Sequence, residues 1–327
     1  MLLHIDQQLE RCARVIRQRV RPRIHPVLAH LGVRAFDIPG EPMPTGEFFA
    51  RLRDGGIDFE PFAIGNQWGT TWGTTWFELT GRIPRDAPEG TPLELWIDLG
   101  WYDHSCGGHI EGLVYRADGT AIKAVHPLNH WVPLVAADGT PQVDVDGEGR
   151  FTVYLEAASN PLLLGVPPFI ETELGERATG RPDEPYTFRA ADLTVYDARF
   201  EHYWTDLDVV STVMAELDKE SPRYWQMAKA LQRSLNAFDE QRPDSVGDAR
   251  AALAGVLAKP ANASAMDVSA IGHAHIDSAW LWPVRETRRK VARTVANALA
   301  LMDDDPDFRY AMSSAQQYVW LEQDHPD

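Results

Sequence analysis

The residues best suited to chemistry form one short run, His273, His275 and Asp277, inside the segment GHAHIDSAWLWP at 272–283. In an extended strand alternate side chains share a face, so both imidazoles and the carboxylate are predicted to point the same way. Neutral imidazole and carboxylate together suit Zn²⁺. The run therefore predicts a metal site. Histidines that only form structural hydrogen bonds at a strand end remain the alternative on spacing alone.

The elements around this run predict the opening of an α/β domain. Residues 268–271 are a short apolar strand candidate, and residues 308–312 resemble a second strand. Between them, one face of a predicted helix carries Val291, Val295, Leu299 and Met302. Strand, helix, strand is typical of parallel α/β folds, whose active sites gather at the carboxyl ends of strands. Since two parallel strands cannot bury both faces, the domain is predicted to be truncated at Asp327.

Residues 61–204 carry the pattern of an antiparallel β-sandwich. Short runs rich in β-branched or aromatic residues recur at 76–79, 93–97, 113–115 and 151–155. Asp-Gly pairs at 118, 138 and 146 are strong turn signals beside these runs. The combination predicts a sandwich of the jelly-roll kind.

The predicted fold is multidomain: a β-sandwich, then helices, then the first strand-helix-strand of an incomplete α/β barrel. Residues 1–60 are expected to form an N-terminal helical extension, 61–204 the sandwich, 205–265 a helical linker region and 266–327 the start of the catalytic domain. The extension opens with an amphipathic helix. In the linker region, Ser221 and Pro222 form a helix start.

Aromatic and metal-ligand types also occur elsewhere. Trp72 and Trp76 of the TTW repeats could stack on sugar rings, but core packing is the favoured interpretation. For the tryptophans after the metal run, packing and a sugar-lined pocket are equally supported. The cluster of His104, Cys106 and His109 matches no standard zinc spacing and contains two glycines, which favours a surface loop.

Composition narrows the partners. Of 327 residues, 44% are hydrophobic and 11 are Trp, enough for packed cores, and the net charge is −17. Such a charge disfavours nucleic acid and membrane surfaces. Only two cysteines occur, Cys12 and Cys106, and neither a signal peptide nor a membrane-spanning run is recognisable. We expect a cytoplasmic protein, and the sequence leaves open whether it forms a homo-oligomer.

GHAHIDSAWLWP resembles the first active-site signature, HxHxDxxW, of the α-mannosidases of glycoside hydrolase family thirty-eight. The preceding zones resemble the amino-terminal region of the cytosolic type. The resemblance implies that His275 and Asp277 bind zinc and that Trp280 stacks on mannose. His273 matches the first histidine of the signature, which supports the metal site without binding the ion.

The resemblance also implies retaining hydrolysis of terminal α-mannosidic bonds in oligosaccharides. The family's nucleophile, general acid and remaining zinc ligands lie further along, and nothing between Arg285 and Asp327 matches their motifs. We therefore expect no catalytic residue within this chain and no activity from it alone.

Two alternatives remain. A metal-dependent amidohydrolase would use His273 and His275 equally as ligands, but the Asp-x-x-Trp continuation and the long β-rich leader argue against it. A non-catalytic carbohydrate-binding module built on the sandwich is the other.

Overall fold

The computed structural model describes residues 5–88, 90–101, 110–136, 138–163, 173–175, 186–261 and 264–326. The chain divides into two compact units, Met1–Pro26 with Val195–Val268 and Val27–Thr194 with Ser269–Asp327. These units differ from the expected division at residues 60, 204 and 265, because each unit combines two separate parts of the chain. Strands begin at Val27, and the end of the chain packs onto the sandwich.

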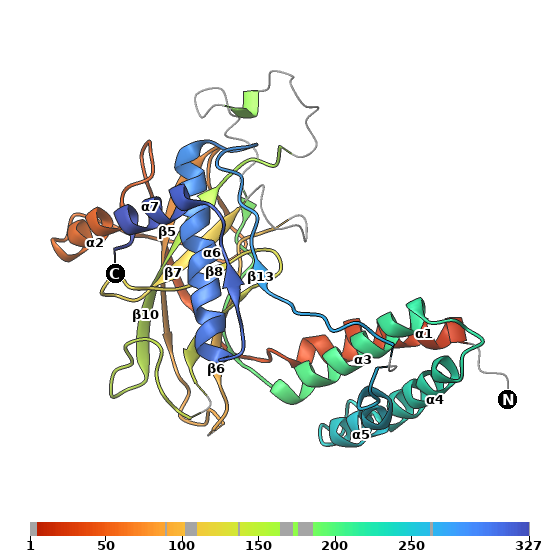
Figure 1. The fold of residues 1–327 in the computed structure, drawn as a ribbon. Coiled ribbons are helices and arrows are strands. Elements are labelled where there is room, and N and C mark those ends of the chain that lie inside the picture. Colours follow the sequence, from red (N-terminus) through yellow and green to blue (C-terminus); the bar gives the residue numbers. More distant parts are fainter. Residues whose placement is uncertain are drawn as a thin grey trace. The chain divides into compact units, whose positions relative to one another are not determined.

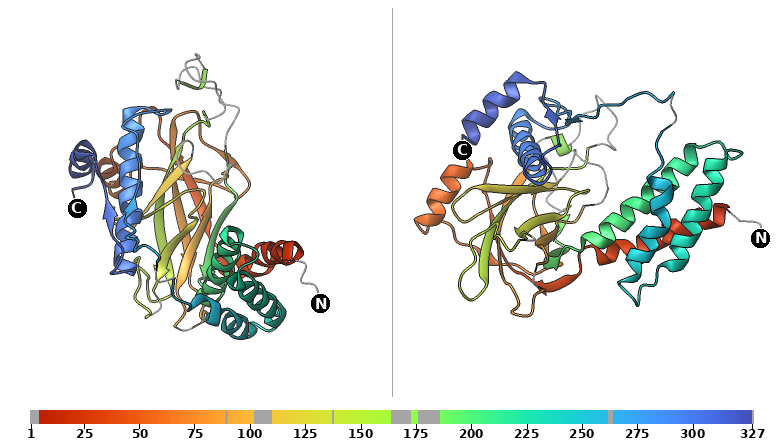
Figure 2. Two further views of the ribbon diagram at one scale, coloured as in Figure 1. Left: turned by 45° about the vertical axis from the view of Figure 1, so that its right-hand side comes forward. Right: turned by 60° about the horizontal axis from the view of Figure 1, so that its bottom comes forward.

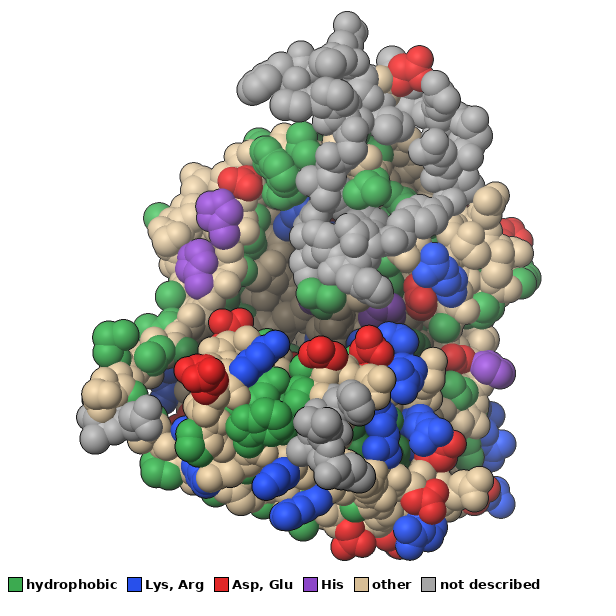
Figure 3. All heavy atoms as spheres, turned by 90° about the vertical axis from the view of Figure 1, so that its right-hand side faces the viewer, with side chains coloured by type: hydrophobic (Ala, Val, Ile, Leu, Met, Phe, Trp, Pro, Cys, Tyr) green, Lys and Arg blue, Asp and Glu red, His purple; other side chains and the backbone are tan. Residues whose placement is uncertain are grey.

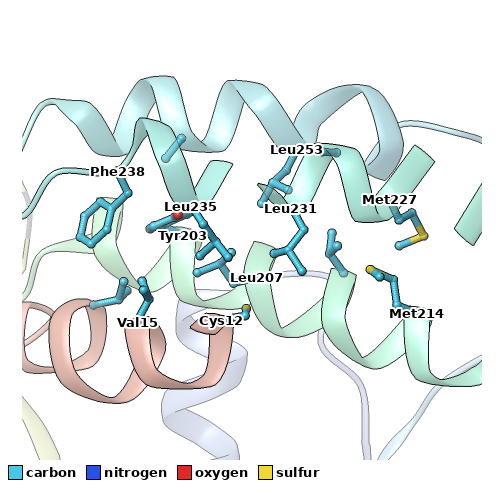
Figure 4. Packing of buried hydrophobic residues seen from close by; sticks show 14 of the residues in the cluster. Cys12, Val15, Tyr203, Leu207, Met214, Met227, Leu231, Leu235, Phe238 and Leu253 are labelled. Atoms are coloured by element: carbon cyan, nitrogen blue, oxygen red, sulfur yellow. The ribbon is translucent and has the colours of Figure 1, made fainter. Parts of the chain in front are cut away.

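The first unit is helical. It contains α1 (Ile5–Val15), a π-helical turn (Ile16–Val20), a 3₁₀ turn (Arg21–Arg23), α3 (Ala198–Glu216), α4 (Pro222–Ala237) and α5 (Ser245–Leu257). Its core combines the predicted apolar face of the opening helix with side chains of α3, α4 and α5. Figure 4 shows Cys12 and Leu207 among these packed side chains. Burial and the nearby Asp208 raise the pKa of Cys12 to about 11, so this thiol is protonated at neutral pH.

The predicted start of α4 is confirmed. The Ser221 hydroxyl accepts a hydrogen bond from the Tyr224 backbone N–H at 3.2 Å, and Pro222 is the first helical residue. Proline loses no hydrogen bond there, because that N–H has no partner within a helix. Sequence chemistry thus determines this helix start locally.

The second unit is built on two antiparallel sheets, which Figures 1 and 2 show face to face. Within the described residues, one sheet has the order β1-β12-β6-β9 and the other β3-β2-β5-β10-β7-β8, while β11 pairs with β4. The strands are β1 (Val27–His30), β2 (Gly32–Asp37), β3 (Glu60–Pro61), β4 (Gln67–Trp68), β5 (Gly73–Arg82), β6 (Leu93–Asp98), β7 (Glu111–Tyr115), β8 (Ala121–Val125), β9 (Trp131–Val135), β10 (Arg150–Ser159), β11 (Tyr186–Thr187) and β12 (Ala190–Val195). The expected antiparallel sandwich is confirmed. A short 3₁₀ turn, Glu173–Gly175, is described between β10 and β11.

The TTW repeats pack inside this unit. Trp76 on β5 is fully buried and stacks on Phe48 of α2 (Thr45–Arg53), with ring centroids 3.7 Å apart. Its neighbour Phe77 lies 4.8 Å from Phe188, and alternate strand residues point to opposite faces. Trp72 is also buried. The core interpretation of these tryptophans is correct, and neither offers a sugar-stacking surface.

The predicted Asp-Gly turns at 118 and 138 are confirmed, whereas in the turn after Asp146 the glycine with a positive φ is Gly149 and not Gly147. The Asp118 carboxylate accepts a hydrogen bond from the Thr120 backbone N–H at 2.8 Å, and Gly119 has a φ of 97°. In the second turn, the Asp138 carboxylate accepts the corresponding hydrogen bond from the Thr140 backbone N–H at 2.8 Å. A positive φ is favourable only for residues such as glycine, so these pairs fix the turn positions.

The end of the chain forms β13 (Gly272–His273), α6 (Val284–Asp304), β14 (Tyr310–Ala311) and α7 (Ala315–Asp324). The parallel pairing of β13 with β14 confirms the strand-helix-strand prediction, and no closed barrel is seen among the described residues. The regular strand begins later than expected, at Gly272. Figures 1 and 2 show α6 lying along the sandwich beside β8.

The predicted apolar face of α6 is only partly correct. Val291 is fully buried, whereas Leu299 is 55% exposed and Met302 is 37% exposed. The buried face instead includes charged side chains, among them Glu286 and Arg293. Helical periodicity misjudged this face because the charges are neutralised by partners on distant strands.

Outer surfaces carry mixed charges. On the face drawn in Figure 3, acidic and basic side chains are interspersed among the described residues. None of the helices in the described ranges combines the length and apolar character needed to cross a bilayer.

Candidate metal centre

The candidate ligands lie on residues 274–283, the metal loop, which joins β13 to α6. The His275 Nε2 and Asp277 Oδ1 atoms are 3.1 Å apart, and the two side chains are 80% and 43% exposed. An imidazole and a carboxylate therefore meet at an accessible point just beyond the carboxyl end of β13.

The pair fits zinc in chemistry and in spacing. Two ligand atoms about 2.1 Å from a tetrahedral zinc ion are separated by roughly 3.4 Å. The observed 3.1 Å requires only a small opening of the pair. Among the described residues no group of three or more His, Cys, Asp or Glu side chains is placed to hold a metal ion. The described part of the chain thus brings together two candidate ligands, fewer than a complete zinc site needs.

His273 and Trp280 flank this pair. His273 is exposed and pairs with Ala311 across the parallel ladder. Trp280 is 56% exposed, while Trp282 is buried and lies 5.4 Å from it in an edge-to-face arrangement. The exposed Trp280 indole, three positions after Asp277, is free to contact a ligand from solvent, whereas Trp282 packs inside. The structure thus assigns different environments to the two tryptophans.

The metal loop holds an unusual backbone conformation. Ala279 has a φ of 101°, which non-glycine residues rarely adopt. Such a residue costs about 1–3 kcal/mol and persists only when surrounding contacts hold it. Trp280 directly follows this residue, and its side chain is exposed to solvent.

Buried side chains supply contacts to the metal loop. Thr287, fully buried in the first turn of α6, donates a hydrogen bond to the Asp277 carbonyl at 3.3 Å and accepts one from Trp282 Nε1 at 3.1 Å. Gln317 on α7 donates to the Ile276 carbonyl at 2.9 Å. Sequence reasoning missed both residues. Gln317 lies 41 positions from Ile276, and no local pattern connects them.

A buried ion network attaches α6 to the sandwich. Arg293 Nη1 lies 2.6 Å from Glu286 and 3.0 Å from Glu111 of β7, and Lys290 Nζ lies 2.9 Å from Glu111. Arg289 pairs with Glu286 at 3.1 Å, and at 2.9 Å with a glutamate of β10, Glu156. Three carboxylates and three cations balance within this cluster. Charge pairing, together with apolar side chains such as Val291 and Ala292, thus joins the helix after the metal loop to the strands.

The network lowers the pKa of its carboxylates. Burial alone would raise the pKa of Glu286, but Arg293, Arg289 and Lys290 outweigh it and lower the pKa to about 2. Burial would also raise the pKa of Glu111, but the nearby cations, of which Lys290 has the largest effect, outweigh burial and lower the pKa. Both side chains are therefore ionised at neutral pH.

A cavity of about 330 Å³ adjoins the metal loop, and the candidate ligand His275 is among the residues that line it. Ala274 and Ile276 line one side, α6 lines another through Arg293 and Asn297, and His126 contributes from beyond β8. Burial lowers the pKa of His126, so this ring is neutral at pH 7. The lining mixes charged and apolar groups.

Acid should weaken the network. Glu286 has a folded pKa of about 2 against an ordinary value of 4.5, so its stabilising contribution is complete above pH 4.5 and is lost as pH falls toward 2. We expect the stability difference between wild type and Glu286→Gln to shrink across that interval. Urea unfolding at a series of pH values measures it, and a constant difference from pH 5 to pH 2.5 would contradict the assignment.

The cluster of His104, Cys106 and His109 lies outside the described residues.

Two family models match the chain. Residues 28–194 match the model described as alpha-mannosidase, jelly roll domain, and residues 265–327 match that of the glycosyl hydrolases family 38 N-terminal domain. The second match contains the whole metal loop.

Several curated proteins are similar over most of the chain. Alpha-mannosidase 2C1 of Homo sapiens is 31% identical over 271 residues, which cover 82% of this chain and 24% of that protein. Alpha-mannosidase of Saccharomyces cerevisiae is 26% identical over 298 residues, with 85% and 25% covered. Alpha-mannosidase G of Dictyostelium discoideum is 25% identical over 278 residues, with 83% and 23% covered. The chain spans about a quarter of the length of these relatives.

Proposed function

Because the chain belongs to the α-mannosidases of glycosyl hydrolase family 38, we propose that it supplies two zinc ligands and one sugar-contacting tryptophan to a retaining α-mannosidase. His275 and Asp277 hold the ion, Trp280 contacts mannose, and His273 supports the site without binding the metal. The substrates are oligosaccharides that end in α-linked mannose. Membership of this family also argues against the alternative of a metal-dependent amidohydrolase.

The observation that carries this proposal is the meeting of His275 Nε2 and Asp277 Oδ1 at 3.1 Å on an accessible loop after a parallel strand. A zinc ion bound there would act as a Lewis acid that grips vicinal hydroxyls of mannose. The chain's own residues would orient the ligands, and the exposed Trp280 indole follows Asp277 by three positions on the same loop. Exposed aromatic faces of this kind suit the C–H face of a sugar ring.

Retaining hydrolysis also needs two carboxyl groups about 5 Å apart across the scissile bond. Acidic side chains of the buried network do not suit this role. Glu111, Glu156 and Glu286 are paired with cations inside the protein, and Glu286 is only 2% exposed. We propose that nucleophile and general acid are not among these 327 residues. We propose a cytoplasmic location for the enzyme, because the chain resembles the cytosolic type of this family.

The activity is tested with a nitrophenyl α-mannoside. We expect the full-length gene product to release nitrophenol and to give α-mannose as the first product detected by NMR, because retention conserves the anomeric configuration. The 327-residue chain alone should show no zinc-dependent turnover. Initial formation of β-mannose would contradict the retaining mechanism. Turnover by the 327 residues would contradict the proposed location of the carboxylates.

A further inference from the structure

We infer that Thr287 and Gln317 are positioning residues that fix the backbone of Asp277 and so set the direction of its carboxylate toward the metal. This inference rests on the proposed function, since it takes Asp277 as a zinc ligand. Neither residue touches the imidazole or the carboxylate that would bind the ion.

The two side chains hold the peptide groups on either side of Asp277. Gln317 Nε2 donates to the Ile276 carbonyl at 2.9 Å, which fixes the peptide plane before Asp277. Thr287 Oγ1 donates to the Asp277 carbonyl at 3.3 Å, which fixes the plane after it. Because each peptide group is planar, holding both planes fixes φ and ψ of the residue between them. The direction of the Asp277 Cα–Cβ bond follows.

Each positioning residue is itself held. An indole N–H can only donate, so the Thr287 hydroxyl must accept from Trp282 and its single proton remains for the Asp277 carbonyl. The second amide proton of Gln317 is directed at Ser278 Oγ, 3.3 Å away. Thr287 is fully buried and Gln317 is 3% exposed, so water competes little for these bonds.

The contacts come from separate elements that are anchored elsewhere. Thr287 follows Glu286, whose ion pairs attach α6 to the sandwich through Arg293 and Glu111. Gln317 belongs to α7, on which Leu321 packs against the cluster of buried residues around Phe48. Thr287 and Gln317 thus attach the metal loop to α6 and α7, two helices that are anchored separately within the same unit. That arrangement suits a site in which a ligand must be held before the ion arrives.

The test measures zinc affinity of the full-length gene product by competition with a chelating indicator. Removing an outer contact of a metal ligand typically weakens binding by about 10- to 100-fold. We expect roughly tenfold weaker zinc binding in Thr287→Val and, independently, in Gln317→Leu. Thr287→Ser should restore the wild-type value, because serine keeps the hydroxyl.

A matched control lies on α7. Gln316→Leu, at the exposed neighbour of Gln317, should bind zinc as the wild type does. Wild-type affinity in both Thr287→Val and Gln317→Leu would overturn the positioning role and leave the metal site intact. Failure of the wild type itself to bind zinc would overturn the proposed function, and this inference with it. Circular dichroism confirms the fold of each variant, and Gln317→Leu tests the idea even if Thr287→Val does not fold.

Discussion

His275→Ala in the full-length gene product should remove most bound zinc and most α-mannosidase activity together. Loss of one ligand from a site of three or four weakens the ion's hold, and the Lewis acid contributes several kcal/mol to the reaction. Activity should therefore fall at least about 100-fold. Zinc content by atomic absorption and hydrolysis of a nitrophenyl α-mannoside are the two readouts.

His273→Ala is the matched control for this variant. His273 is the same residue type two positions earlier, exposed, and proposed to support the site without binding the ion. Its loss should leave zinc content near the wild-type value. Stoichiometric zinc in His275→Ala would refute the ligand assignment, and equal zinc loss in both variants would show that His273 is a ligand as well.

Glu286→Gln should lower the free energy of unfolding of the sandwich-containing unit by about 3 kcal/mol. Removing one partner of a buried ion pair leaves the others uncompensated, and this typically costs 3–5 kcal/mol. Glu286 contacts Arg293 at 2.6 Å and Arg289 at 3.1 Å, and it also accepts a hydrogen bond from Asn160 at 2.8 Å. Urea unfolding followed by tryptophan fluorescence gives the difference.

Glu322→Gln provides the comparison, because Glu322 is exposed on α7. Its effect should stay within about 0.5 kcal/mol, as for most surface substitutions. A Glu286→Gln variant as stable as Glu322→Gln would show that the buried network does not hold α6 on the strands. In Glu286→Leu with Arg293→Met, part of the loss should be recovered, since apolar side chains of similar volume can replace a buried pair.

Much of the fold could be predicted because its signals are local. The strand at 76–79 is a short run rich in aromatic residues, Asp118 with Gly119 specifies a turn, and Ser221 with Pro222 specifies a helix start. Each depends on residues a few positions apart. The closeness of His275 and Asp277 could also be predicted, because the two residues are only two positions apart, although the regular strand already ends at His273.

The parts that could not be predicted depend on distant partners. Arg293 lies 182 positions from Glu111, and nothing in the sequence of α6 shows that its charged face is the buried one. In the sequence, nothing distinguishes Gln317 from other polar residues of a helix, and only the structure shows its contact with Ile276. For the same reason the end of the chain was not expected to join the unit that begins at Val27.

Zinc binding by His275 and Asp277 can be located in a crystal of the full-length gene product grown with zinc and measured at the zinc absorption edge. We expect an anomalous peak about 2.0–2.2 Å from both His275 Nε2 and an Asp277 carboxylate oxygen, with the Trp280 indole beside it. A zinc peak bound elsewhere, or none at these two side chains, would contradict this assignment.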